Sequence, residues 1–555
     1  MTGAAISARR GVDLDRVFLA LCLVIPLAAL LLFFAYPLAT VILRSFTESD
    51  GGLGLGNYAR ILNAPSFWRA TFNSLVMSIS TTILALVLGL VVACAVHRCR
   101  VPGRALLVGA VSLPLLAPSL VQGLGLIFLL GRNGIVTKFT GLDINIYGFW
   151  GLLIANGLYA LPQAVLIIGA ALRAADARIY EAAEVLGTPA HRQFLDITLP
   201  NIKFGLLSAG FIVFTVTITD FGNAATIGGD YAILATEIYS QVVGQMNFNM
   251  GAVVGILLLF PTIMAFYLER VASQRQLGSL SDSAIPLVPV FTSQRDVPMT
   301  IAAWLIAALP IVTVGIVIYG SFVRLWPYRF DLTFRHYDVK VAGGYEPLWM
   351  TIQISLMAGV IGTILLFALG FCLQRLPRHA VKPIYFLCLL PASVPGLVLG
   401  LAYIFAFNVP SLPLYALYGT ATLLAACNVT HYWTQGFLTT MTGLRQVPAT
   451  LEETASCMGA SLPRVVRDVI IPSLAPTLIS VFFFMFMRSM VTLSAVIFLV
   501  TASVSVASVS IMRLDEAGFV SQAAAFAVCT MGVVVAALGL MKLSLWLIGR
   551  RQTIR

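Results

Sequence analysis

Charged residues are scarce in this chain. Asp, Glu, Lys and Arg make up only 10% of its 555 residues, whereas soluble domains carry about 25%. Hydrophobic residues make up 59%, and the mean hydropathy is +0.94. These values exclude an ordinary soluble domain and indicate a polytopic membrane protein. The apolar runs have the length of helices, not the short alternating segments of an outer-membrane barrel, so we expect helices to cross the bilayer.

Cysteine and histidine are also few. The eight cysteines form no CxxC pair and lie mostly in apolar segments, so we interpret them as packing residues and not as a disulfide framework or a metal site. The five histidines are scattered, which disfavours an intramembrane enzyme. No GxxxxGK[ST] motif occurs, so we expect no nucleotide site in this chain, no cofactor and no bound metal. The net charge of the chain is +11. Lys and Arg are typical of the cytoplasmic loops of membrane proteins, so this charge does not require a nucleic-acid partner.

Twelve apolar segments are long enough to cross a bilayer, which takes about 20 helical residues. A polar, proline-containing stretch, residues 273–298, separates the first six segments from the last six. The predicted spans lie near Val17–Leu43, Phe72–Val96, Ala105–Leu130, Tyr147–Leu172, Phe204–Phe221, Met250–Leu268, Thr300–Val323, Trp349–Leu373, Ile384–Phe407, Leu414–Thr439, Ser473–Thr501 and Ser521–Ile548. We therefore expect an all-α membrane protein with about 12 transmembrane helices. Its halves would be residues 1–272 and 299–555, joined by a cytoplasmic linker.

Lys and Arg are distributed unevenly between the segments that connect these spans. With the N-terminus inside, most of the 34 Lys and Arg residues fall on the inner side, as the positive-inside rule requires. This orientation predicts that both termini are cytoplasmic. It also places the polar loops at residues 181–200 and 453–472 in the cytoplasm.

The two halves repeat one another in the same order. Pro114 and Pro118 recur as Pro391 and Pro395 at one constant spacing. The loop after the fourth span, EAAEVLGTPAHRQFLDITLP, recurs after the tenth as ETASCMGASLPRVVRDVIIP. Two tandem repeats of six spans in this order are parallel, related by an axis along the membrane normal. One chain would then supply both halves of a pseudo-dimer.

Each of these loops has the pattern of a short helix, a glycine turn and a second helix. Asp176 is placed to cap the first helix of the first loop, and Thr450 with Glu453 has the spacing of a capping box. Gly187 and Gly459 are placed to end the two short helices. Such an elbow presents a rigid, partly apolar knob with a fixed carboxylate, suited to insertion into a groove on a partner.

The loops are similar to the EAA signature of type I ABC importer permeases, in which Glu-Ala-Ala is followed by a glycine and by Leu-Pro. The resemblance implies the fold of those permeases and a coupling helix in each loop, seated in a cleft of a cytoplasmic ATPase dimer. The residues that it assigns to coupling are Glu181, Ala182, Ala183, Gly187, Pro200, Glu453, Ala455, Gly459 and Pro472. The second loop departs from the pattern at Thr454 and Ile471, so the two docking sites need not be equivalent.

The same resemblance implies the rest of the assembly. The chain would be the non-enzymatic permease of a binding-protein-dependent importer in a bacterial inner membrane. Its partners would be the ATPase dimer, which hydrolyses ATP, and an extracytoplasmic substrate-binding protein, which delivers a small solute.

Nearly the whole chain resembles the fused two-repeat permeases of the ferric-iron and 2-aminoethylphosphonate importers. The stretch ITDFGNAATIGGDYAILATEIYSQVVGQMNFNMGA is more similar to the aminoethylphosphonate branch. This phosphonate is therefore the expected substrate, and ferric iron is the alternative. A secondary transporter of the major facilitator type would also show two repeated halves, but it would need neither an ATPase nor EAA loops.

Polar residues in or beside the spans are candidates for a substrate pathway. Asp220 ends span five and Asn223 follows it, Arg488 lies in span eleven, and His431 lies in span ten. One hypothesis is that Asp220 and Arg488 meet charged groups of the substrate; the other is that they form a structural ion pair between the halves. His431 lies either on the pathway or among core side chains.

The outer loop after the seventh span is rich in aromatic residues. Its members are Trp326, Tyr328, Phe330, Phe334 and Tyr337. This loop either contacts a binding protein or forms part of an interfacial aromatic belt.

Overall fold

The computed structural model describes residues 3–48, 51–141, 144–278, 285 and 287–553. The protein is an all-α polytopic membrane protein, and its described part has a single short hairpin, β1 (Val323–Leu325) and β2 (Arg329–Leu332). The chain forms two compact units. The first comprises Met1–Arg44, Tyr345–Ala507 and Gly532–Arg555, and the second comprises Ser45–Gly344 and Ser508–Met531.

The first unit is built on the second repeat. Its helices are α1 (Gly3–Leu30), η1 (Leu31–Ala35), α2 (Tyr36–Ser45), α16 (Glu346–Leu373), α17 (Arg378–Leu389), η7 (Leu390–Ser393), α18 (Gly396–Phe407), η8 (Pro413–Leu417), α19 (Ala421–His431), α20 (Trp433–Gln446), α21 (Ala449–Cys457), α22 (Leu462–Val465), η9 (Val466–Ile470), α23 (Ile471–Met490) and the later part of α25 (Val520–Thr553).

The second unit is built on the first repeat. Its helices are α3 (Gly56–Leu62), α4 (Pro65–Arg98), α5 (Arg104–Ser112), η2 (Leu113–Leu116), α6 (Leu120–Leu130), α7 (Ile135–Thr140), α8 (Phe149–Arg173), α9 (Ala177–Val185), α10 (Ala190–Arg192), η3 (Gln193–Thr198), α11 (Leu199–Ile218), α12 (Gly222–Ile227), α13 (Leu234–Tyr239), η4 (Ser240–Gly244), α14 (Phe248–Gly278), α15 (Ser293–Phe322), η5 (Arg335–Tyr337), η6 (Val341–Gly343) and most of α24 (Ala507–Glu516).

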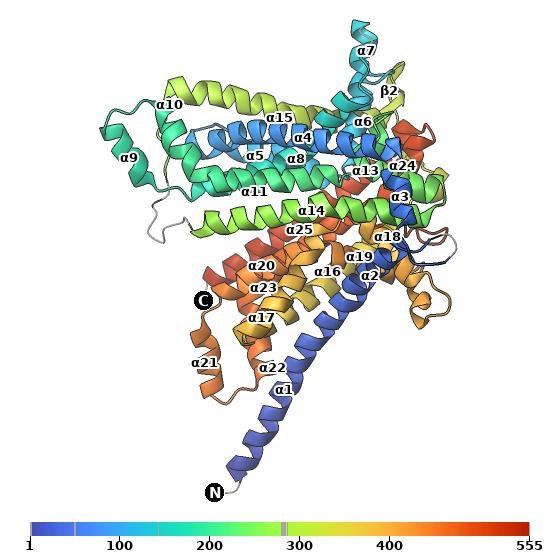
Figure 1. Cartoon of the computed structure of the whole chain (residues 1–555). Helices are drawn as coiled ribbons and strands as arrows, with labels where there is room; N and C mark the ends of the chain where they lie inside the picture. Colours follow the sequence, from blue (N-terminus) through green and yellow to red (C-terminus); the bar gives the residue numbers. More distant parts are fainter. Residues whose placement is uncertain (1–2, 49–50, 142–143, 279–284, 286, 554–555) are drawn as a thin grey trace. The chain divides into compact units, whose positions relative to one another are not determined.

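The units do not coincide with the sequential halves, because each takes the first helix of the other repeat. Helix α1 packs on α16 in the first unit, and α15 packs on α4, α5 and α6 in the second; Figure 1 shows α15 running beside α4. Ala303 and Ala307 of α15 join a buried apolar cluster with residues of α4 and α5. Small residues let these helices approach closely, which is the main source of packing energy between helices in lipid.

Among the described residues, ten helices are long and apolar enough to cross a membrane, or eleven if the bent pair Arg378–Ser393 and Gly396–Phe407 counts as one, close to the predicted number of about twelve. The predicted span Leu414–Thr439 is divided at Tyr432 into the two helices α19 and α20. The predicted third span is also interrupted, between η2 and α6, where Pro118 cannot donate a backbone hydrogen bond.

The predicted linker is shorter than residues 273–298. Helix α14 continues to Gly278, and α15 begins at Ser293. Residues 279–284 and 286 lie outside the described part of the chain.

A buried polar contact joins two helices inside each unit. In the second unit, Asn223 Nδ2 donates to Asn156 Oδ1 at 2.9 Å. In the first unit, Asn428 Nδ2 donates to Ser489 Oγ at 2.6 Å. Asn156 and Asn428 are repeat equivalents, so both units use the same helix position for an interhelical hydrogen bond.

Candidate docking elbows, polar contacts and outer pocket

The first elbow consists of α9, a glycine turn and α10. Asp176 caps α9: its carboxylate accepts from the Arg178 backbone N–H at 3.1 Å. The Arg178 side chain also donates to this carboxylate, at 2.6 Å for the shortest contact, and these hydrogen bonds lower the pKa of Asp176 to about 2. Glu181 and Ala182 are exposed, and Ala183 is buried. The helix therefore presents the motif glutamate to solvent and packs its second alanine inward.

The glycine turns of the two elbows have the same geometry. Gly187 and Gly459 have φ values of +69° and +75°, a left-handed conformation that favours glycine. The amide of each glycine bonds to a carbonyl three residues earlier, at 2.9 Å in both turns. The next amide bonds to Ala183 O at 2.9 Å in the first turn and to Ala455 O at 3.1 Å in the second. The motif alanines thus accept the hydrogen bonds that close the turns.

Apolar side chains project from the tips of both elbows. In the first, Val185 is 89% exposed and Leu186 is 81% exposed. In the second, Met458, the repeat equivalent of Leu186, is 78% exposed. Each elbow thus exposes at least one large apolar side chain at its tip.

The second helix of each elbow is continuous with the following span. Ala190–Ile218 and Leu462–Met490 each form one helix of 29 residues. Both contain a π-helical turn, η3 or η9, directly before the segment with Pro200 or Pro472. A proline lacks the amide that an α-helix needs at this point, and the wider π turn accommodates it. Pro200 and Pro472 therefore lie within a continuous helix.

The predicted caps agree with the structure in the first elbow only. Asp176 is the N-cap of α9, as expected. The capping box at Thr450 and Glu453 is wrong, because α21 begins at Ala449 after Pro448 and has no side-chain cap. Thr450 is already helical, and its carbonyl accepts a hydrogen bond from the Thr454 hydroxyl at 2.7 Å.

Each elbow is tied to its own unit by an arginine. In the second unit, Arg98 Nη2 donates to the Tyr180 hydroxyl at 2.9 Å. In the first unit, Arg375 forms an ion pair with Glu452. Tyr180 and Glu452 each directly precede the glutamate of the EAA motif. The contacts therefore join the short helices α9 and α21 to the ends of α4 and α16.

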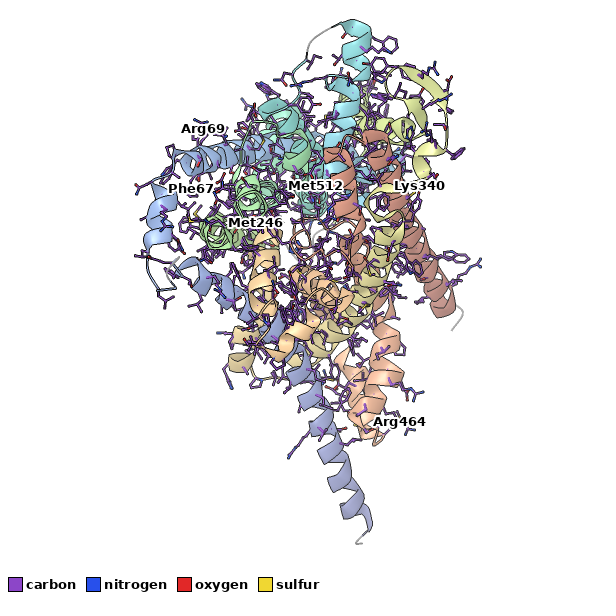
Figure 2. All side chains as sticks on the ribbon, turned by 90° about the vertical axis from the view of Figure 1, so that its right-hand side faces the viewer. Phe67, Arg69, Met246, Lys340, Arg464 and Met512 are labelled. Carbon is purple, nitrogen blue, oxygen red and sulfur yellow. The ribbon has the colours of Figure 1, made fainter. Side chains whose placement is uncertain are left out.

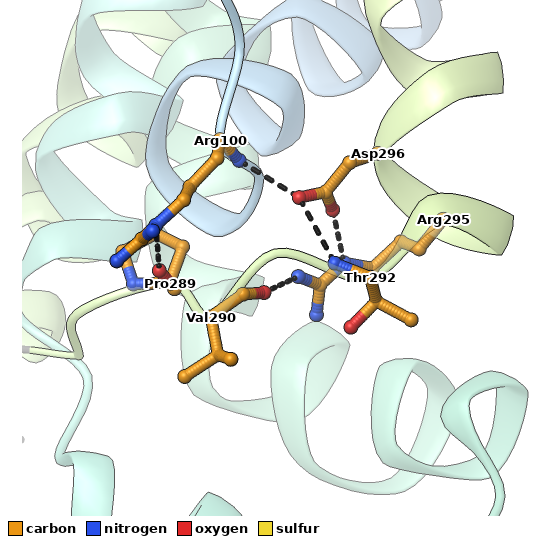
Figure 3. A network of polar contacts seen from close by, with 6 residues as sticks. All are labelled: Arg100, Pro289, Val290, Thr292, Arg295 and Asp296. Carbon is orange, nitrogen blue, oxygen red and sulfur yellow. Dashed lines mark hydrogen bonds and ion pairs between the residues drawn. The ribbon is translucent and has the colours of Figure 1, made fainter.

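The end of the inter-repeat linker is bound to the same region as the first elbow (Figure 3). Asp296 accepts from the Arg100 backbone N–H at 3.1 Å and from Arg295 Nε at 2.8 Å. Arg100 Nε donates to Pro289 O at 3.0 Å. Earlier in the linker, Ile285 O accepts a hydrogen bond at 2.9 Å from the Ala177 amide at the start of α9. This segment therefore braces the base of the first elbow.

The second elbow is braced by a different segment. The Leu462 amide at the start of α22 donates to Asp15 Oδ1 of α1 at 2.8 Å. Phe18 and Leu19 of the same helix pack against a cluster that includes Ala455. Arg464 projects from α22 at the end of the first unit (Figure 2). The two elbows have equivalent turns but unlike supports.

Two of the predicted pathway residues meet in the second unit. Asp220 lies just after α11 and is 9% exposed. Its Oδ2 accepts from the Asn223 backbone N–H at 3.0 Å, and the Asn223 side chain donates to Asn156. Both residues thus organise the turn between α11 and α12 through hydrogen bonds inside the unit.

The other two predicted residues meet in the first unit. The Arg488 guanidinium lies 5.2 Å from the centre of the Tyr432 ring, and the His431 ring packs on Tyr432 at 4.7 Å. The Tyr432 hydroxyl also contacts Thr492 Oγ1 at 2.8 Å. Tyr432 brings Arg488 and His431 together, and it was not predicted from the sequence. Its position between the polar residues His431 and Thr434 was the available signal.

The outer aromatic loop forms one wall of a pocket. Its hairpin packs on α6 and α7: Trp326 contacts Phe128 at 5.0 Å between ring centres, and Lys138 Nζ donates to Pro327 O at 2.7 Å. The pocket has a volume of about 800 Å³. In Figure 1 the hairpin and α7 lie at the opposite end of the unit's long helices from α9. The pocket is therefore on the other side of the membrane from the first elbow.

Cationic side chains dominate the charge of this pocket. Its charged lining residues are Arg132, Arg324, Arg335, Lys340 and Asp338; Figure 2 labels Lys340. The one carboxylate, Asp338, is paired with Lys340 at 3.1 Å. The lining also includes Trp326 and Gln522, whose Nε1 and Oε1 atoms are buried without a hydrogen-bond partner. The arrangement suits contact with acidic groups.

The chain is also similar to known proteins. A family model described as "Binding-protein-dependent transport system inner membrane component" matches residues 85–277 and 365–543, one match in each repeat. Each match contains one elbow and most of the helices around it.

Two relatives match along most of their own length. The ferric transport system permease protein FbpB of Actinobacillus pleuropneumoniae is 29% identical over 88% of this chain and 73% of its own. A putative ferric transport system permease protein FbpB 1 of Haemophilus influenzae is 29% identical over 86% and 77%. Among solved structures, a bacterial ABC transporter involved in the import of the acidic polysaccharide alginate matches 49% of this chain and 100% of its own. That match has 18% identity and a TM-score of 0.40.

Proposed function

Because this chain belongs to the family of binding-protein-dependent transport system inner membrane components, we propose that it forms the membrane channel of a ferric-iron importer. A separate ATPase subunit would drive the channel. The observation that carries the proposal is the pair of elbows with matching glycine turns and exposed apolar tips. Two such knobs on one chain suit a partner with two equivalent clefts, as an ATPase dimer has.

The proposed mechanism couples the elbows to the helices. Closure of the ATPase dimer on ATP would move both elbows, and the continuous helices Ala190–Ile218 and Leu462–Met490 would carry that motion into the membrane. Hydrolysis would reset the elbows. This chain would contribute no chemistry to ATP hydrolysis; its part is the two-state movement that links the two sites.

Ferric iron replaces 2-aminoethylphosphonate as the proposed cargo. The FbpB relatives, by their names, belong to ferric transport systems, and neither name supports phosphonate transport. Within the described residues, no group of three or more His, Cys, Asp or Glu side chains could hold a metal ion. A permease must release its cargo quickly, so weak and transient contacts suit this role better than a tight site.

An extracytoplasmic binding protein is the second proposed partner. The basic pocket beside the hairpin would receive acidic side chains of that protein, because its cations outnumber its carboxylates. The secondary-transporter alternative has no support in the family match, which covers both elbows.

The experiment is ATP-driven uptake by proteoliposomes that hold the permease and its ATPase subunit, with binding protein added outside. Ferric iron, aminoethylphosphonate, phosphate and a polyamine would each be offered with a cognate binding protein. We expect iron uptake by the wild type and its loss in the Glu181→Ala, Glu453→Ala double variant. Glu184→Ala, an exposed glutamate on the same helix but outside the motif, is the matched control and should import normally.

Two results would contradict the proposal in different ways. Uptake of another solute but not of iron would reject the cargo and keep the importer. Uptake that needs no ATPase subunit and follows a proton gradient would reject the importer itself.

A further inference from the structure

The two arginines that hold the elbows occupy equivalent positions in the repeats. Arg98 ends α4, and Arg375 lies just after α16. Each precedes the first repeated proline, Pro114 or Pro391, by the same number of residues. Equivalent positions with equivalent contacts point to one device built twice. We call the pair Arg98–Tyr180 the first latch and the pair Arg375–Glu452 the second latch.

The first latch is a buried contact without a carboxylate. The Arg98 side chain is 8% exposed, and its guanidinium lies 4.3 Å from the centre of the Tyr180 ring. Besides the Tyr180 hydroxyl, Arg98 Nη2 reaches Leu172 O at 3.4 Å. The Tyr180 hydroxyl in turn contacts Thr198 Oγ1 at 3.1 Å. A single arginine therefore connects α4, the end of α8, the coupling helix and the π turn before α11.

The second latch is an ion pair on an aromatic base. The Arg375 guanidinium lies 3.5 Å from the centre of the Phe371 ring, and Nη1 donates to Phe371 O at 2.8 Å. Nη2 donates to Glu452. Ring and carbonyl fix the direction of the guanidinium, so the carboxylate of α21 is held at a defined place. Arg375 and Glu452 are 19% and 31% exposed, which leaves the pair partly screened by water.

The position of the latches explains why they would matter for transport. Each coupling helix leads into the following span through the glycine turn, but a turn alone transmits force only along the chain. The latch adds a second connection, from the residue before the motif glutamate to a helix of the bundle. With both connections present, the elbow and two transmembrane helices must move together.

We infer that Arg98 and Arg375 are positioning residues that couple elbow movement to the helix bundle, an inference that rests on the proposed import function. Loss of a latch would leave the elbow able to bind the ATPase subunit but less able to move the helices. ATP would then be hydrolysed with little import. Coupling free energies of proteins typically correspond to about 5- to 150-fold effects, and a latch should lie at the lower end of this range.

The test compares import per ATP hydrolysed in proteoliposomes. We expect a drop of about tenfold for Arg98→Ala and for Arg375→Ala, and of about threefold for the milder Tyr180→Phe and Glu452→Gln. Tyr180→Phe keeps the ring under the guanidinium, and Glu452→Gln keeps the shape, so these two variants should fold. Glu184→Gln on α9 and Ser456→Ala on α21 are the controls, and both should match the wild type.

Rescue separates coupling from a merely structural role. The conservative variant Arg375→Lys keeps a cation over the Phe371 ring and facing Glu452, so it should retain at least about half of the wild-type import per ATP. The inference is overturned if Tyr180→Phe and Glu452→Gln import at the wild-type ratio. It is also overturned if the folded Arg375→Lys variant is as defective as Arg375→Ala.

A second measurement does not depend on the cargo. In the permease alone, amide hydrogen exchange of α9 and α21 should be at least about threefold faster in the corresponding latch variants than in the controls. Unchanged exchange in both helices would overturn the inference. If the wild type imports none of the four solutes, the proposed cargo fails, and the exchange data still decide whether the latches hold the elbows.

Discussion

Leu186 and Met458 occupy the same position at the tips of the two elbows, and both are largely exposed, 81% and 78% of their surface. Each directly precedes the glycine that turns the chain back toward the membrane. An apolar side chain in this place gains little from the fold of its own chain. We propose that a partner's groove buries this surface.

The first prediction follows from these tips. Leu186→Ser and Met458→Ser should each weaken binding of the ATPase subunit by about 1–2 kcal/mol, roughly five- to thirtyfold in the dissociation constant, because the apolar contact is lost. Binding would be measured with purified subunits by surface plasmon resonance. Leu332→Ser, on the hairpin and 71% exposed, is the control. Equal affinity of all three variants would show that the tips do not dock.

The second prediction concerns the packing of α6 on α15. A Cβ at Gly125 would lie 2.5 Å from the Thr313 carbonyl oxygen, a backbone atom that cannot move aside alone. Gly125→Ala should therefore destabilise the protein by about 1–3 kcal/mol. Gly109→Ala is the matched control, since its Cβ would meet no atom within 4 Å, and alanine is the better helix former. Thermal unfolding in detergent would compare them, and equal midpoints would contradict the packing.

The third prediction concerns the cap of α9. Hydrogen bonds from Arg178 lower the pKa of Asp176 from its usual value near 3.8 to about 2. A lowered pKa means that the charged cap stabilises the helix above about pH 4 and loses this effect as the pH falls from about 4 to about 2. Amide exchange of α9 in the wild type should therefore accelerate over that range, beyond its intrinsic pH dependence. In Asp176→Asn it should follow the intrinsic dependence alone, and an identical profile in both proteins would reject the cap.

The fourth prediction concerns the outer pocket. Arg324→Glu and Arg335→Glu should weaken docking of the binding protein by about tenfold or more and reduce its salt dependence, because like charges then face its acidic surface. Arg329→Glu, on the same hairpin but not in the pocket lining, should have a smaller effect. The measurement is the dissociation constant at low and high ionic strength. If all three variants bind alike, the pocket is not the docking surface.

Much of the candidate site could be predicted from the sequence because its determinants are local. Asp176 caps a helix two residues away, and Gly187 and Gly459 adopt the left-handed turns that their position suggested. The spacing of Glu, Ala and Gly in residues 181–200 and 453–472 sets which face of each short helix is exposed. These features depend on backbone geometry within one or two helical turns, so sequence patterns report them directly.

Other features could not be read in this way, because they depend on distant contacts. Hydropathy counts apolar residues and cannot detect the turn at Tyr432, whose ring lies near Arg488 of α23 and whose hydroxyl contacts Thr492 just after that helix. The pairing of Arg98 with Tyr180 joins residues far apart in the chain. The hypothesis of an Asp220–Arg488 contact stays untested, since the two residues belong to different units.

The sequence by itself determined that this protein crosses a membrane, that it is built from two parallel repeats, and that each repeat carries a loop with a glycine turn between two helices. Low charge, helix-length apolar runs and recurrent glycines and prolines are sufficient for these conclusions. Only the tertiary structure decided that α1 and α15 each pack on the helices of the other repeat, and that arginines fasten the elbows. The physical reason is that any apolar helix can pack against several others in lipid, and the choice among them is made by close steric fit and by a few buried polar contacts.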